Sequence, residues 1–255
     1  MNQQNLGGIR LKEVITFQTQ IMMGAQFGRV MSKEPEEIII ACLRMGWNDA
    51  FRHTSKNKKN GEKSVLEEGE TKWRQKHEVP HDDYICGNIL NQDPVRKAFR
   101  DFALAGSTEA KVNTIKSHYP ELELLFGQYK ETTGKQKLCF GHFQKMFNIA
   151  IKLYVCLYLC REWLDLPTDV FEEDILNNIQ NADCPVDSII LEHLAKDSEN
   201  TKYKSHKWSQ YEHNDGNYQQ AQDEISRLDK TAGKSNLYYD FIAWNREQVS
   251  RKDHE

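Results

Sequence analysis

Cysteine and proline are scarce in this sequence, with six of each among 255 residues. The cysteines form neither the dense framework of a disulfide-stapled domain nor the four-cysteine run of an iron–sulfur site, and paired Cys-x-x-Cys motifs for zinc are missing. The sequence therefore indicates a protein of a reducing compartment. We expect no metal ion and no other cofactor.

A surplus of positive charge is also absent. The formal net charge is -4 and the pI is about 6.2, so the molecule as a whole presents no basic field to a nucleic acid. A local basic cleft is compatible with this average. The longest apolar run is interrupted by lysines and too short to span a bilayer, and the opening MNQQNLGGIRLKEV lacks the apolar core of a signal peptide. We expect a monomeric, cytoplasmic protein that does not bind membranes.

Internal repeats and runs of alternating polar and apolar residues, the mark of β-strands, are missing as well. The most distinctive stretch, residues 141–163, reads GHFQKMFNIAIKLYVCLYLCREW and is apolar on nearly every face. Such a pattern predicts a central helix with other helices packed around it. Together with a length that suffices for one large core, it predicts a single all-α domain over residues 1–255.

Capping residues, early acids and prolines mark the ends of the other expected helices. A break at Tyr119-Pro120 separates two short ones, and residues 182–187 form a linker. The predicted helices are 34–51, 93–102, 109–118, 121–129, 166–180, 188–196, 218–229 and 237–248.

Two basic segments could contact phosphates. The polar stretch 53–74 contains Lys56, Lys58 and Lys59, and Lys135 and Lys137 precede the central helix. Lysines in such positions neutralise DNA phosphates in many complexes. For the stretch 53–74, an ordinary solvated loop is the simpler interpretation.

Two lysines, Lys145 and Lys152, interrupt the central apolar segment. They lie seven positions apart, so on a helix both amines point to one side, roughly 10 Å apart along the axis. A lysine in a buried helix has to reach solvent, find a partner or take part in chemistry. Asp187 is the third distinctive residue, because it follows a proline at the start of a later apolar helix. Its simplest interpretation is a helix N-cap, and that of Lys145 is a solvated lysine at a helix start.

Together these features resemble a known family. The segment KMFNIAIK at 145–152 resembles the catalytic-lysine helix of the helix–hairpin–helix DNA glycosylases, especially the archaeal 8-oxoguanine glycosylase branch. In that branch a lysine opens an apolar helix, a second lysine follows seven residues later, and a downstream Pro-Val-Asp supplies the catalytic aspartate. Residues 185–187 match that segment in type and order. The stretch KLCFGHFQ stands where the family has a glycine-rich hairpin and departs from it.

The resemblance implies a two-lobed helical bundle that binds double-stranded DNA and flips a modified base into a pocket. Lys145 would be the nucleophile, and Asp187 the carboxylate that stabilises positive charge on the sugar or activates the attacking group. The amine must be neutral to attack, and burial or a nearby cation lowers a lysine pKa toward that state. Lys152 would be that second cation, a base-pocket residue or a phosphate contact. The expected substrate-binding residues are Phe140, His142, Phe143, Gln144, Lys152 and Trp208.

The implied substrate is oxidised guanine or a hypermodified cytosine, for example a glucosylated one in phage DNA, in which case the protein would serve antiviral defence. Cleavage of the abasic strand through Lys145 could follow excision. Two alternatives belong to other classes. A non-enzymatic helical module that binds nucleic acid or protein would leave Lys145 and Asp187 far apart or facing solvent, and an amine-nucleophile enzyme for a small carbonyl substrate would need a closed pocket.

Overall fold

The structure, a computed structural model, describes residues 6, 7, 9, 34–52, 86–133, 138–162 and 164–252. Within these ranges the chain is mostly helical and contains no β-strand, which confirms the predicted all-α class for this part of the protein. The α-helices are α2 (Pro35–Trp47), α5 (Asp93–Leu104), α6 (Thr108–Thr133), α7 (Phe140–Leu159), α8 (Glu173–Asn177), α9 (Ser188–Asp197), α10 (Asn217–Arg227) and α11 (Leu237–Lys252).

Short helical turns connect several of these helices. Two are π-helical, η2 (Asn48–Arg52) and η4 (Cys86–Leu90). The 3-10 turns are η5 (Thr168–Val170), η6 (Ile179–Asn181), η7 (Thr201–Ser205), η8 (Trp208–Gln210) and η9 (Asp229–Thr231).

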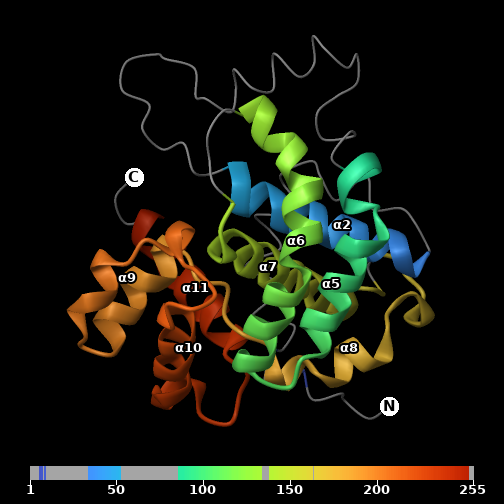
Figure 1. The fold of residues 1–255 in the computed structure, drawn as a ribbon. Coiled ribbons are helices and arrows are strands. Elements are labelled where there is room, and N and C mark those ends of the chain that lie inside the picture. Colours follow the sequence, from blue (N-terminus) through green and yellow to red (C-terminus); the bar gives the residue numbers. More distant parts are fainter. Residues whose placement is uncertain are drawn as a thin grey trace.

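Helix α7 is the centre of the core. Every residue from Phe140 to Leu157 is buried, as the apolar sequence predicts for a helix surrounded on all sides. Helices α2, α5 and α6 pack against it, and α9, α10 and α11 gather on the left in Figure 1. Aromatic rings fill the contact with α5, where Phe147 lies 6.1 Å from Phe99 and 5.4 Å from Phe102 between centroids.

Helices α2 and α7 approach each other unusually closely at Gly46. A Cβ atom added to this residue would lie 2.1 Å from the carbonyl oxygen of Met146. The absence of a side chain at Gly46 therefore sets the distance between the two helices. This contact brings the end of α2, and the η2 turn that follows it, against the first turns of α7.

The predicted break at Tyr119-Pro120 is wrong. Residues 108–133 form one continuous helix, α6, with Pro120 inside it, where two short helices were expected. A proline removes one backbone donor, and tertiary contacts can hold the helix across it. Here the hydroxyl of Tyr119 donates to the carbonyl of Leu138, and its ring packs edge-on against Phe143.

The region 166–180, predicted as one helix, is instead divided into η5, α8 and η6. Its backbone leaves the helical path at Phe171, which is extended, and the next amide, of Glu172, donates to the hydroxyl of Tyr154. The central helix also ends at Leu159, before the predicted end at 163. Asp165 has a φ of 52°, and the amide of Leu166 donates to the carbonyl of Arg161, so the chain reverses through a left-handed residue.

Gly46→Ala is expected to lower the free energy of unfolding by about 1–3 kcal/mol, because the new methyl group forces α2 away from α7. Urea unfolding followed by circular dichroism measures the change. Gly127→Ala is the matched control, since Gly127 is also helical and its Cβ would meet no atom within 4 Å. That variant is expected to gain roughly 0.5–1 kcal/mol from helix propensity. Equal effects at the two glycines would show that the close approach at Gly46 does not limit the packing.

Candidate active site

The amine of Lys145 lies at a meeting point of three segments. Its Nζ atom is 2.9 Å from Oδ2 of Asp49, in η2, and 3.4 Å from Oδ2 of Asp187, at the start of α9. The amine also donates to the backbone carbonyl of Asp49, at 3.3 Å. The ring of Trp208 lies 4.8 Å away, measured from Nζ to the ring centroid. The structure thus brings together Lys145, Asp187 and Trp208, which the sequence singled out, and adds Asp49.

Asp187 is the N-cap of α9, as its sequence context predicts. Its Oδ1 atom accepts from the backbone amides of Ile189, at 2.9 Å, and Ile190, at 3.0 Å. These bonds satisfy two donors that every helix start leaves unpaired. The second oxygen, Oδ2, is the one that faces Lys145. The capping role and the proximity to the amine therefore use different oxygens of the same carboxylate.

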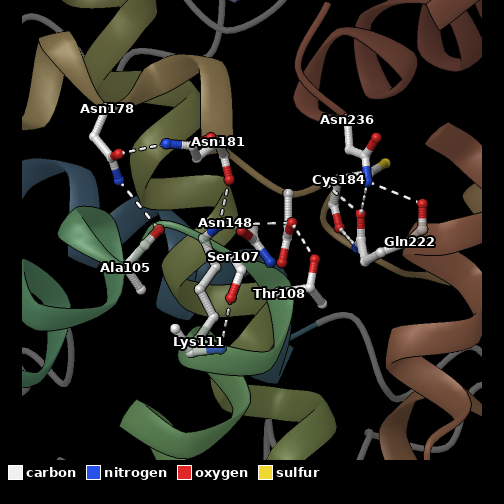
Figure 2. A network of polar contacts seen from close by, with 12 residues as sticks. Ala105, Ser107, Thr108, Lys111, Asn148, Asn178, Asn181, Cys184, Gln222 and Asn236 are labelled. Carbon is white, nitrogen blue, oxygen red and sulfur yellow. Dashed lines mark hydrogen bonds and ion pairs between the residues drawn. The ribbon is translucent and has the colours of Figure 1, made fainter.

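The extended linker that carries Asp187 is held by two glutamine side chains. Gln144, from α7, donates to the carbonyl of Val186 at 2.8 Å and accepts from its amide at 3.2 Å. Gln222, from α10, does the same for Cys184, at 2.7 and 3.0 Å. Figure 2 shows the second of these contacts. Each side-chain amide makes the two hydrogen bonds that a neighbouring β-strand would make. The backbone donors and acceptors of Val186 and Cys184 are therefore paired without a strand. Gln144, predicted as a pocket wall, instead fixes the backbone beside Asp187.

A buried ion pair anchors the other end of this linker. Lys111, which is 0% exposed, lies 3.6 Å from Oδ1 of Asp183 and also donates to the carbonyl of Asn181. Asp183 accepts from the hydroxyls of Thr108 and Tyr218, both at 2.9 Å. The linker is therefore fixed by α6, α7 and α10 at once, which limits the freedom of Asp187.

Trp208 reaches the site because Gly141 has no side chain. A Cβ atom on Gly141 would lie 1.9 Å from the carbonyl oxygen of Trp208. The amide of Gly141 also donates to the carbonyl of Tyr211, at 3.0 Å, so η8 packs directly on the first turn of α7. His142 completes this contact, with its ring edge-on to that of Trp208 at 5.7 Å.

The pKa of Lys145 is raised above its ordinary value. Burial lowers it, but the carboxylates of Asp187 and Asp49 more than offset this effect. The expectation that burial or a second cation would hold this amine neutral is therefore wrong for the free protein. Lys145 is an ammonium group at neutral pH, and it has to lose a proton before it can attack an electrophile.

Lys152 is engaged in a second buried pair. Its amine contacts Oδ2 of Asp240, in α11, and each side chain is only 1% exposed. The rings of Phe241 and Trp244 lie 5.1 and 5.9 Å from the amine. Burial raises the pKa of Asp240 to about 6, although the Lys152 amine partly offsets this. Asp240 balances the charge of Lys152, so Lys152 does not act as the second cation that was expected to lower the pKa of Lys145.

The two phenylalanines predicted as pocket walls lie in the hydrophobic core. Phe140 packs edge-on against Tyr218, at 5.2 Å between centroids. Phe143 packs in the same way against Phe126, at 5.5 Å. Both side chains are fully buried. Their spacing along α7 points them to other sides of the helix than Lys145.

The lysines predicted to contact phosphates lie outside the described residues, as does the whole of the predicted polar loop 53–74. They are Lys56, Lys58, Lys59, Lys135 and Lys137.

Sequence analysis missed Asp49 and Asp240. Both lie in apolar surroundings, in the segments WNDAF and YYDFIAW. A lone carboxylate within an apolar helical segment is the signal that could have identified them, because buried lysines require such partners. The contact of Gln222 with the linker could not be predicted, because its sequence neighbours are those of an exposed helix.

The part of the chain that the structure describes contains no group of three His, Cys, Asp or Glu side chains placed to hold a metal ion. Within the same ranges, none of the helices combines the length and the apolar character that a membrane crossing needs.

Comparison of the chain with family models, curated proteins and solved structures finds no match.

His142 is expected to destabilise the protein in mild acid. Burial, and to a lesser degree the charge of Lys145, lower its pKa to about 4, while its Nδ1 atom accepts from the amide of Cys139. The native state therefore keeps His142 neutral between pH 6.5 and 4, whereas the unfolded chain takes up a proton. The free energy of unfolding should fall as the pH falls through this window, by roughly 2–3 kcal/mol from this residue.

Denaturant unfolding of the wild type and His142→Gln across pH 4 to 7 measures this contribution. Their difference at each pH cancels the opposite effect of Asp240, whose raised pKa makes the native state less stable as the pH rises from about 4 to about 6. The wild type should lose stability relative to the variant as the pH falls. A difference that is constant with pH would contradict the assignment.

Asp240→Leu is expected to destabilise the protein by about 3–5 kcal/mol, because it leaves the buried ammonium of Lys152 without its carboxylate. The double variant Lys152→Met/Asp240→Leu removes both charges and should recover most of this loss. Thermal unfolding of Asp240→Leu, Lys152→Met and the double variant measures the coupling between the two side chains. Additive losses would mean that the two side chains do not depend on each other.

Proposed function

We propose that the protein is a DNA N-glycosylase that excises a modified base with Lys145 as nucleophile and Asp187 as charge-stabilising carboxylate. The observation that carries the proposal is the 3.4 Å distance between the Lys145 amine and Oδ2 of Asp187. The two residues are 42 positions apart in the sequence (187 − 145) and come from two helices. In a binding module this pair would only balance the charge of a buried lysine, whereas the glycosylase reaction requires the two groups to meet.

The chemistry fits the residue types. Cleavage of an N-glycosidic bond develops positive charge on the sugar, which a nearby carboxylate stabilises. A neutral amine that attacks C1′ displaces the base, whose nitrogen keeps the electron pair of the broken bond and takes a proton. The amine then opens the sugar ring to an iminium ion, as lysine nucleophiles do with carbonyl carbons. This covalent intermediate is the species that permits cleavage of the abasic strand.

The surroundings of Lys145 support a nucleic-acid substrate. Trp208 lies beside the amine and is only partly buried, so its ring is available for stacking on a flipped nucleotide. The segment that carries it includes three exposed lysines, Lys202, Lys204 and Lys207, which suit contacts with phosphates. These features, together with the helical fold and the resemblance of residues 145–152 and 185–187, favour a two-lobed bundle of the helix–hairpin–helix glycosylase type.

The proposed substrate is oxidised guanine or a hypermodified cytosine, such as a glucosylated one in phage DNA, and the protein would in the second case act in antiviral defence. We propose no substrate contact for Lys152, because its amine is buried in the pair with Asp240. The alternative function is a non-enzymatic helical module that binds nucleic acid or protein. It is favoured by the Lys111–Asp183 pair, which shows that this fold also uses buried Lys–Asp pairs for structure alone.

Borohydride trapping on duplex oligonucleotides that carry a panel of modified bases tests the proposal. The wild type should form a covalent adduct with one of them, and Lys145→Gln should form none. Lys196→Gln is the matched control, because Lys196 is an exposed lysine of α9 and its variant should trap normally. Asp187→Asn should lower the rate about 100-fold or more while it retains the helix cap, since asparagine caps as well as aspartate.

Circular dichroism that shows each variant folded at the assay temperature confirms that these losses are chemical. A wild type that leaves abasic sites dependent on Asp187, but forms no adduct, would be a glycosylase without lyase activity. The absence of both adducts and abasic sites on every base would leave the binding module as the function.

A further inference from the structure

The nearest carboxylate to the Lys145 amine is not Asp187 but Asp49. Its Oδ2 atom is 2.9 Å from Nζ, which is hydrogen-bond distance, whereas Oδ2 of Asp187 is at 3.4 Å. The backbone carbonyl of Asp49 accepts from the same amine. Asp49 therefore receives the better-formed contact of the two.

The position of Asp49 follows from the packing of α2 on α7. Gly46 brings the two helices together against the carbonyl of Met146, the residue after Lys145. The chain then enters the π-helical turn η2, which packs on α7 and places Asp49 beside the amine. Turns of this kind are rare and are found frequently at functional sites.

The two carboxylates differ in what else they do. One oxygen of Asp187 is occupied by two backbone amides of α9, and the side chain is 8% exposed. The Asp49 side chain is 29% exposed and so has contact with solvent. A group that accepts a proton and passes it on needs such a route, whereas a group that only stabilises charge does not.

The residue before Asp49 also indicates a ligand. Within the described part of the chain, neither side-chain atom of Asn48 has a hydrogen-bond partner, although the residue is only 8% exposed. A buried amide left without partners is unfavourable by roughly 1–3 kcal/mol. An unpaired buried polar group in a native structure calls for an explanation, such as a bound water, an ion or a functional role. The η2 turn thus contains, next to Asp49 in the sequence, an amide that a ligand would satisfy.

We propose that Asp49 is a third catalytic residue, the acceptor of the proton that Lys145 must lose before it attacks C1′ of the nucleotide. This inference rests on the proposed glycosylase function and gives the two carboxylates different roles. Asp49 accepts the proton from Lys145, and Asp187 stabilises the positive charge that develops on the sugar.

The proton transfers balance as follows. The ammonium of Lys145 gives one proton to Asp49 and becomes a neutral amine. The nitrogen lone pair forms a bond to C1′ while the C1′–base bond breaks, and its electrons leave with the base, which takes the proton from Asp49. The attached nitrogen is now a secondary ammonium. Transfer of one of its protons to O4′ accompanies cleavage of the C1′–O4′ bond and gives the iminium ion, with Asp49 again a carboxylate.

Other charged groups around this amine bear on any pH profile. Within the described residues they are Asp187 at the start of α9, His142 one turn earlier in α7, and the Lys152–Asp240 pair of α7 and α11. Asparagine has nearly the same shape as aspartate, so Asp49→Asn keeps these side chains in place. It also removes a charge that helps to raise the pKa of Asp240. The comparison of Asp49→Asn with the wild type therefore reports the loss of the Asp49 charge, including its effect on Asp240.

The test is the pH dependence of single-turnover borohydride trapping on two duplexes, one with the modified base and one with a preformed abasic site. If Asp49 accepts the proton, Asp49→Asn should lower the maximal trapping rate about 100-fold. The rising limb of its profile should also move to lower pH, because the amine loses one of its two carboxylates. Asp169→Asn, which removes an exposed carboxylate of η5, should behave as the wild type.

The result that overturns the inference is an Asp49→Asn protein whose trapping rate at pH 7 equals or exceeds that of the wild type. Asp49 would then only hold Lys145 protonated. Trapping of the wild type on the abasic duplex, but on no modified base, would remove the proposed substrates and still decide the role of Asp49. A wild type that traps on neither duplex would overturn the function and the inference together.

Discussion

The burial of positive charge in the central helix is the constraint on which the rest of the structure depends. A lysine buried in an apolar core is strongly unfavourable unless a carboxylate accompanies it. Helix α7 contains two, Lys145 and Lys152, and their partners come from η2, α9 and α11. Segments that are distant in the sequence are thereby required to meet at α7. The same requirement that stabilises the fold assembles the candidate active site.

Close packing determines how well that site is defined. At Gly46 and Gly141, α7 and a neighbouring segment approach so closely that any side chain would clash. The contact at Gly46 places Asp49 beside Lys145, and the contact at Gly141 places Trp208 there. The linker before Asp187 is extended and has no strand beside it, so Gln144 and Gln222 supply its hydrogen bonds. Preorganisation of this kind is what charge stabilisation in a transition state demands.

The sequence predicts the elements better than the contacts between them. The apolar run of α7 and the cap at Asp187 depend on local periodicity and local bonding, and both are found as predicted. The continuity of α6 through Pro120 depends on distant partners of Tyr119, which no local pattern reveals. Asp49 was missed for the same reason. A requirement of charge balance, that two buried lysines need carboxylates from apolar segments, would have pointed to it.

Comparison of the three buried Lys–Asp pairs argues for chemistry at only one of them. Lys111 and Asp183 are 0% and 4% exposed, and Lys152 and Asp240 are each 1% exposed, so both pairs are closed to solvent. Among the described residues, Lys145 contacts two carboxylates, whereas Lys111 and Lys152 each contact one, and Asp49 is 29% exposed. An ion pair that served only stability would gain nothing from a second carboxylate in contact with water. A nucleophile that must release a proton would gain an acceptor and a route for the proton to leave.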